Sequence, residues 1–182
     1  MVVLINREFE VFIDQEHRFT VEWRRASKRR EYLLNELTQK NALILYDLKY
    51  WFGKISCSIQ QEGSFFLFET VKRWKTKYSC LVGSDLYEIY SHRGTKYSVY
   101  KNDIQIAWWD TSIINWRGKN VYKMVLDKDC NYELVISFCL ILALSFGGTP
   151  GNMLSFNIGN IGGQGKTFDN QWFFEPDSLV NL

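Results

Sequence analysis

Two clusters of basic residues have the composition best suited to binding a charged ligand. The first surrounds Trp74 and consists of Lys72, Arg73, Lys75 and Lys77. If this segment is a strand, alternation places Arg73, Lys75 and Lys77 on one face. Cations interleaved with an aromatic ring can bind a phosphorylated headgroup, and each cation near an anionic bilayer contributes about 1 kcal/mol. The alternative is a solvated face, which is the usual explanation of a charge run.

The second basic cluster lies nearer the N-terminus. Its five cations fall within seven residues: Arg24, Arg25, Lys28, Arg29 and Arg30. The chain carries 22 basic and 20 acidic residues, so its formal net charge is only +2. A near balance of charge does not favour nucleic acid as a partner. An anionic membrane lipid or a protein is the expected partner.

A phosphate-loop motif is suggested by Gly165-Lys166-Thr167, but the sequence around it does not fit. The motif requires glycine at position 160, where this chain has Asn160. The loop must also leave a strand and open a helix that holds the phosphates. Only fifteen residues follow Thr167, which is too few for most of a nucleotide-binding sheet. We therefore expect a glycine-rich loop and no nucleotide cofactor.

Acidic and amide side chains alternate just before an apolar segment, at Asp127, Asp129, Asn131 and Glu133. A calcium loop of this pattern needs glycine at its sixth position and an acid at its twelfth. Those positions are Tyr132 and Phe138. Helix capping by Asp129 or Asn131 explains the same residues, with acids at the positive end of the helix dipole. No metal is predicted.

Residues for catalysis are scarce. The two histidines, His17 and His92, are each followed by arginine in a predicted turn, and no nearby Cys, Asp or Ser pattern marks a base or a metal ligand. They are expected to be surface histidines. No G-x-S-x-G nucleophile elbow is present. The sequence does not predict an enzyme.

The segment Leu134–Phe146 is apolar on every side and is followed by Gly147-Gly148. A helix of this kind must be buried in a core or a membrane. Its length of roughly 20 Å is short of the roughly 30 Å of a bilayer core, so a buried helix over about 131–146 is predicted. Insertion as a short anchor, with the segment extended to Tyr132–Gly151, is the alternative.

The residues before this helix form short strand-like segments separated by turns. The clearest hairpin joins 97–100 to 104–109 through Lys101-Asn102-Asp103, and another turn is predicted at Gln15-Glu16-His17. One exception is Glu31–Leu43, where Leu33, Leu34 and Leu37 share a helical face and Ser27 is a plausible cap. Many strands followed by one buried helix predict a mainly β fold, a barrel with its lumen filled by the helix.

The segment YEIYSHRGTKYSVYKNDIQIAWW, the WRGKN turn, VYKMVLDKD and the apolar helix resemble the tubby C-terminal-like superfamily. That superfamily includes the tubby domain, the phospholipid scramblases and the LURP-one-related proteins, and the chain looks like a small bacterial member. The resemblance covers roughly 65–146. It implies a closed antiparallel barrel of about twelve strands around a central hydrophobic helix near the C-terminus.

Together these observations predict a barrel domain over 1–148 and a Gly- and Asn-rich tail over 149–182. Aromatic side chains of the tail are available to dock on the barrel: Phe168, Trp172, Phe173 and Phe174. Four cysteines without a CxxC pair, and an N-terminus without a signal-peptide pattern, favour the cytoplasm. The predicted function is a non-catalytic binding module that recognises anionic lipid or phosphorylated headgroups peripherally at the inner face of the membrane. The alternative is a protein-interaction or structural domain without a lipid role, whose tail docks on itself or on a partner.

Overall fold

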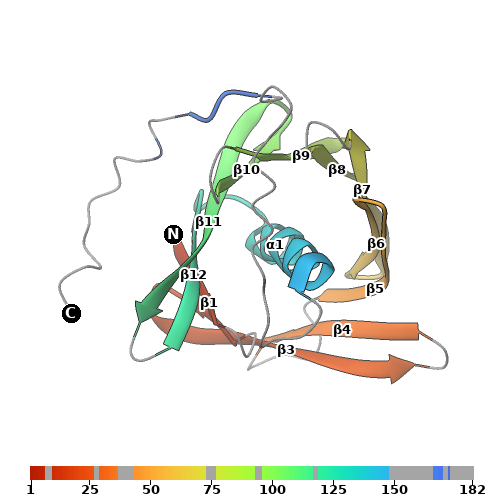
Figure 1. Cartoon of the computed structure of the whole chain (residues 1–182), viewed down its shortest axis with the longest axis horizontal. Helices are drawn as coiled ribbons and strands as arrows, with labels where there is room; N and C mark the ends of the chain where they lie inside the picture. Colours follow the sequence, from red (N-terminus) through yellow and green to blue (C-terminus); the bar gives the residue numbers. More distant parts are fainter. Residues whose placement is uncertain are drawn as a thin grey trace.

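The computed structural model describes residues 1–6, 10–26, 29–36, 43–72, 77–92, 96–116, 119–147, 166–169 and 172. Within these residues twelve strands form one closed antiparallel barrel around a single helix (Figure 1). Each strand pairs with its neighbours in sequence, and β1 closes the barrel by pairing with β12. The predicted fold class is confirmed.

The strands follow one another as an up-and-down series. Their bounds are β1 Val2–Asn6, β2 Glu10–Ile13, β3 Glu16–Ala26, β4 Arg29–Glu36, β5 Leu43–Trp51, β6 Lys54–Gln61, β7 Ser64–Lys72, β8 Lys77–Val82, β9 Asp85–Ser91, β10 Lys96–Lys101, β11 Ile104–Trp116 and β12 Lys119–Leu126. Successive side chains of a strand point to opposite faces. In β6 the side chains of Ile55, Cys57 and Ile59 are therefore buried together.

The helix α1, Tyr132–Gly147, runs through the inside of the barrel (Figure 1). Its start is capped by Asn131, whose Oδ1 accepts a hydrogen bond from the N–H of Leu134 at 3.1 Å. Leu134, Ile136 and Ile141 have no exposed surface. The predicted buried helix and its cap are thus confirmed, and among the described residues no helix is long and apolar enough to cross a bilayer.

Aromatic rings from the strands pack directly against the helix. The ring of Phe138 lies 5.6 Å from that of Phe68 and 5.8 Å from that of Tyr87, centroid to centroid. Pairs of this geometry contribute about 0.5–1.5 kcal/mol beyond the burial of their area. Phe68 and Tyr87 therefore fill space between the helix and the barrel wall.

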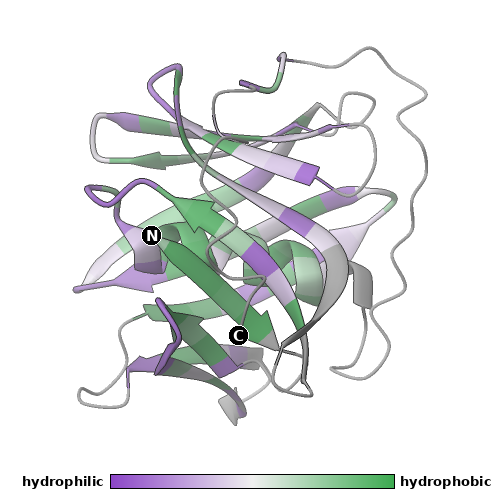
Figure 2. Ribbon diagram, turned by 90° about the vertical axis from the view of Figure 1, so that its left-hand side faces the viewer, coloured by the Kyte–Doolittle hydropathy of each residue, from purple (hydrophilic) through white to green (hydrophobic). Residues whose placement is uncertain are grey.

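The first strand is hydrophobic from Val2 to Ile5, and Figure 2 shows its hydrophobic colour beside the label N. Val3 and Ile5 belong to the core around the helix. Leu4 points to the other face and is buried as well. A strand with both faces covered favours a continuous apolar run over alternation, which is the pattern of this strand.

The helix predicted for Glu31–Leu43 is wrong, because residues 29–36 form strand β4. It pairs with β3 over its full length and with β5 over Glu31–Leu34. The Glu- and Leu-rich segment has good helix propensity, but propensity is a weak preference that tertiary pairing overrides. Without β4 the barrel would expose two unpaired strand edges. Ser27, the predicted cap, and residues 37–42 lie outside the described residues.

The predicted hairpin between β10 and β11 is confirmed, with a turn at Asn102-Asp103. Both turn residues have positive φ, 49° and 72°, as a type I′ turn requires. The amide oxygen of Asn102 also accepts a hydrogen bond from the N–H of Leu86 at 2.9 Å. The earlier turn is displaced from its predicted place, because Asp14 and Gln15 make it and β3 begins at Glu16.

We expect Leu140→Asp to unfold the protein, since Leu140 is fully enclosed in the core and an unpaired buried charge costs several kcal/mol. The expected loss in the free energy of unfolding is about 4 kcal/mol or more. Urea denaturation followed by circular dichroism measures it. The matched control is Leu81→Asp, at an exposed strand position. Equal stability of the Leu140 variant and the parent would contradict a helix-filled barrel.

Candidate functional site

The antiparallel order of the barrel gathers one set of strand ends at each end. Three of the connections at one end are flanked by Ala26 and Arg29, Trp51 and Lys54, and Lys72 and Lys77. We call this end the basic end, because both basic clusters of the sequence are joined to it. Residues 27–28 and 73–76 themselves lie outside the described residues.

The opposite end, which we call the acidic end, is rich in carboxylates. Its turns and adjoining strand ends include Asp14, Glu16, Glu62, Asp85, Asp103, Asp127 and Asp129. Some of these acids pair with cations, as Glu16 does with Arg18, Asp85 with Lys101 and Asp103 with Lys166. Charges separated in this way orient a protein near a charged surface.

An exposed group of aromatic side chains projects at the basic end. Tyr50, Trp51 and Phe52, which we call the aromatic tip, are 52%, 74% and 67% exposed. The exposed residues Lys49 and Lys54 flank them. The rings of Trp51 and Phe52 lie 5.5 Å apart. A contiguous group of large exposed apolar side chains marks an interaction surface more often than a scattered one does.

The backbone of the aromatic tip is strained. Phe52 and Gly53 form the two-residue turn between β5 and β6, and Phe52 has φ +49°. This left-handed conformation costs a side chain such as Phe about 1–2 kcal/mol, and Asn-Gly is the favoured pair in such a turn. Strain retained at an exposed position suggests a function for the residue that bears it.

The predicted site residues Lys72, Arg73, Lys75 and Lys77 do not lie along one strand. The described backbone places Lys72 opposite Lys77 as cross-strand partners, so the chain reverses between them. A single continuous strand through residues 72–77, on which the predicted alternation was based, is therefore not formed, and the placing of Arg73 and Lys75 on one face with Lys77 stays a prediction. The side chain of Lys72, and both Arg73 and Lys75, lie outside the described residues.

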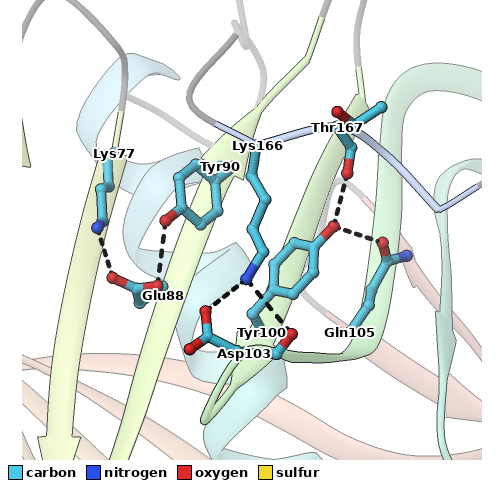
Figure 3. A network of polar contacts seen from close by, with 8 residues as sticks. All are labelled: Lys77, Glu88, Tyr90, Tyr100, Asp103, Gln105, Lys166 and Thr167. Carbon is cyan, nitrogen blue, oxygen red and sulfur yellow. Dashed lines mark hydrogen bonds and ion pairs between the residues drawn. The ribbon is translucent and has the colours of Figure 1, made fainter.

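Lys77 is occupied by a contact within the barrel wall (Figure 3). Its Nζ lies 2.5 Å from Glu88 Oε1 and 5.3 Å from the centre of the Tyr90 ring. The Tyr90 hydroxyl donates to the other oxygen of Glu88 at 3.1 Å. Desolvation works to lower the pKa of the Lys77 ammonium, but the hydrogen bonds to Glu88 and Tyr90 outweigh it and the pKa is raised. Lys77 thus holds β8 to β9.

In the second basic cluster Arg24 is the one residue whose side chain is described. Its Nε donates to Glu31 Oε2 across the β3–β4 pair at 2.7 Å. The side chains of Arg25, Arg29 and Arg30, and the whole of Lys28, lie outside the described residues. The position of this cluster at the basic end is therefore given only by the described ends of β3 and β4.

The phosphate-loop residues Lys166 and Thr167 contact the barrel. Lys166 donates to Asp103 Oδ1 at 2.7 Å, and its Nζ lies 4.1 Å from the centre of the Tyr100 ring. The carbonyl of Thr167 accepts a hydrogen bond from the Tyr100 hydroxyl at 2.9 Å. These contacts give Lys166 a docking role in place of a phosphate-binding one (Figure 3).

His92 is buried, which corrects the prediction of a surface histidine. Its Nε2 lies 2.5 Å from Ser98 Oγ, and the ring of Phe168 packs edge-on against it at 5.3 Å. The sequence near His92 does not predict this burial, because Phe168 belongs to the tail. His17 has intermediate exposure, and its Nε2 lies 3.1 Å from the carbonyl of Phe19.

A histidine beside a serine could in principle activate a nucleophile. Such a pair needs a third group that orients the imidazole, but His92 Nδ1 is buried without a hydrogen-bond partner among the described residues. Ser98 has no exposed surface. The pair therefore provides neither an oriented base nor an accessible hydroxyl in this arrangement.

Gln61 binds two of the polar residues at the start of the helix, Asn131 and Glu133. Its Nε2 donates to Glu133 Oε2 at 2.6 Å, and Asn131 Nδ2 donates to Gln61 Oε1 at 3.1 Å. Burial raises the pKa of Glu133 in spite of this hydrogen bond. In the part of the chain that the structure describes, no three His, Cys, Asp or Glu side chains gather as a metal ion would require.

The four cysteines are free thiols. Burial raises the pKa of Cys57, Cys80 and Cys139 to about 12 and that of Cys130 to about 11. A thiol reacts through its thiolate. These side chains therefore act as small core hydrophobes rather than as nucleophiles.

The chain matches no family model, no curated protein and no solved structure. The resemblance to the tubby C-terminal-like superfamily therefore stays a prediction. The features of the described residues that are suited to binding are the aromatic tip, the two charged ends and the contacts of the tail.

We expect Phe52→Asn to stabilise the protein by about 1 kcal/mol, because asparagine adopts the left-handed conformation at lower cost. Urea denaturation of the parent and the variant measures the difference. The control is Trp51→Asn, at a neighbouring strand position whose backbone carries no positive φ. A destabilised Phe52 variant would show that its side chain contributes to the fold and is not held there against strain.

His92 makes the stability dependent on pH. Burial lowers the pKa of its imidazole below the ordinary value near 6.5. The unfolded chain therefore takes up the proton first, and stability present above about pH 6.5 is lost as the pH falls towards the folded pKa. Between about pH 7 and about pH 5 we expect a larger loss in the parent than in His92→Gln. Equal losses in urea denaturation would show that His92 is not responsible.

Proposed function

We propose that the protein is a non-catalytic binding module that attaches peripherally to anionic membranes through its basic end. The observation that carries the proposal is the aromatic tip, with Trp51 and Phe52 largely exposed between Lys49 and Lys54. Tryptophan and tyrosine are enriched at the membrane–water interface. Cations beside them add attraction to anionic lipid at about 1 kcal/mol each.

The shape of the tip favours a bilayer over a protein partner. Phe52 lies in the two-residue turn at the end of a hairpin, and Trp51 is the strand residue before it. A fluid lipid surface accommodates such exposed side chains without a matching cavity. Burial of one such ring contributes about 1.5–3 kcal/mol. In this proposal the free energy gained by inserting the Phe52 ring into the membrane exceeds the free energy cost of its strained backbone, which explains why phenylalanine stands at this position.

The charge distribution gives the attachment a direction. A surface of anionic lipid attracts the basic end and repels the carboxylates of the acidic end, which include Asp14, Glu62 and Asp127. The barrel would then stand with its acidic end away from the lipid. The proposed location is the cytoplasmic face of a membrane, where anionic lipids are concentrated.

Co-sedimentation with vesicles tests the proposal. The full-length protein should bind phosphatidylserine-containing vesicles, release in high salt, and bind pure phosphatidylcholine weakly. We expect the double variant Trp51→Ser/Phe52→Asn to lose about tenfold or more in affinity, since two buried rings are lost. The matched control is Ile104→Ser, an apolar residue of similar exposure, 70%, at the acidic end.

Arg73→Ala/Lys75→Ala separates the electrostatic part from insertion, and it leaves the Lys77–Glu88 ion pair in place. This variant should weaken binding to anionic vesicles, and urea denaturation checks that it remains folded. Binding that ignores anionic lipid, or that survives the loss of both tip aromatics, would refute the proposal.

A protein-interaction role without lipid is the second candidate. It is favoured by one specific observation, the docking of tail residues Lys166 and Phe168 on the outer wall of the barrel. This role needs neither the aromatic tip nor the basic end. The vesicle assay therefore distinguishes the two candidates.

A further inference from the structure

Strands β10 and β11 carry an outward face that is buried. Ser98 lies directly opposite Trp108, and Tyr100 lies directly opposite Gln105, so each pair shares one face. Val99 and Ala107 face the core. With His92, these four side chains form what we call the tail-binding face, and all five are buried although none belongs to the core around the helix.

Four consecutive residues of the tail, 166–169, contact this face. Phe168 packs edge-on against His92 at 5.3 Å and against Trp108 at 6.0 Å. Two residues earlier, Lys166 lies over the ring of Tyr100 and reaches Asp103. The contacts thus use a cation and an aromatic ring that are separated by one residue.

The tail backbone also forms hydrogen bonds with side chains of the face. The Tyr100 hydroxyl donates to the carbonyl of Thr167 at 2.9 Å, and Gln105 Oε1 accepts from the N–H of Asp169 at 3.2 Å (Figure 3 shows the first of these). Backbone contacts of this kind accept any sequence in an extended segment. The side chain of Thr167 is exposed, so its position does not select for a residue type.

The tail leaves two buried polar atoms of the face unsatisfied. Gln105 Nε2 and His92 Nδ1 have no hydrogen-bond partner among the described residues. A buried polar atom without a hydrogen-bond partner destabilises the arrangement that leaves it so. A ligand whose acceptor reaches Gln105 Nε2 would gain a hydrogen bond that the tail does not make.

We propose that the tail-binding face is a recognition site for an extended peptide of another protein, with a basic residue followed two positions later by an aromatic one. Residues 166–169 are its intramolecular occupant. Because the occupant is tethered to the same chain, its effective concentration is of the order of millimolar. An external peptide with the same spacing of a basic and an aromatic residue competes with it for the same contacts.

The experiment uses the full-length chain and a labelled peptide of residues 163–172, GQGKTFDNQW, whose binding is followed by fluorescence anisotropy. In the double variant Lys166→Ala/Phe168→Ala, which we call the released chain, the tail binds the tail-binding face more weakly. The released chain should bind the peptide about tenfold or more tightly than the parent, because the site is no longer occupied. The same peptide with both residues replaced by alanine should not bind.

Two further variants show where the peptide binds. Adding Tyr100→Phe to the released chain removes the hydroxyl that donates to the carbonyl of residue 167. This substitution should weaken peptide binding. The matched control is Thr167→Ala in an otherwise unaltered chain. It should behave as the parent, since Thr167 contacts the face through its backbone carbonyl. Urea denaturation of each variant checks that the barrel remains folded.

The proposal is overturned if the peptide binds the parent and the released chain equally, or binds neither while both are folded. A concentration-dependent dimer of the parent that Phe168→Ala abolishes would overturn the choice of partner, because the occupant would then be the tail of a second copy. Vesicle binding is expected to be the same in the parent and the released chain, so the outcome does not depend on the proposed membrane role.

Discussion

The inside of a closed twelve-strand barrel must be filled, and the rest of the structure depends on how that is done. A barrel of this size leaves more room than side chains from its own strands fill. Helix α1 occupies that room, and because it is enclosed on all sides, none of its faces can be polar. The strands in turn must present apolar side chains such as Phe68 and Tyr87 to it. The polar groups at the start of the helix are satisfied where it meets the wall, by Asn131 and Gln61.

Closure of the barrel also determines how its charged residues are distributed between the two ends. With strands paired in sequence order, successive turns alternate between the two ends. Clusters that are far apart in the sequence, at 24–30 and 72–77, are therefore joined to the same end, while carboxylates such as Glu62 and Asp127 lie at the other. The charge asymmetry follows from connectivity, and a net charge of +2 gives no sign of it.

The sequence predicts most of what is local. The helix over 132–147 follows from its uniform apolarity, and the β10–β11 hairpin follows from a polar turn between apolar runs. Strand β4 could not be predicted in this way, because its pairing with β3 and β5 overrides a helical pattern in Leu33 and Leu34. Local information fails wherever a distant partner decides the structure.

The candidate sites were harder to predict, for two different reasons. The aromatic tip had a signal in the sequence, since a Trp-Phe-Gly turn between two strands must expose large rings. The environment of His92 had none, because the ring that packs against it belongs to Phe168, which lies beyond the barrel and the helix in the sequence. A contact between residues so far apart in the chain can be seen only in the folded structure.

The two proposed surfaces occupy different parts of the barrel, and this separation constrains how the protein could work. The aromatic tip lies at one end, whereas the tail-binding face lies on the wall, where Lys166 reaches the Asp103 turn of the acidic end. The proposed attachment by the basic end would place the part of this face nearest Asp103 away from the lipid. A peptide that displaces the tail would then be held beside the membrane without competing for lipid. In such an arrangement the barrel acts as a rigid spacer between a lipid surface and a peptide, and this task requires no catalytic residue.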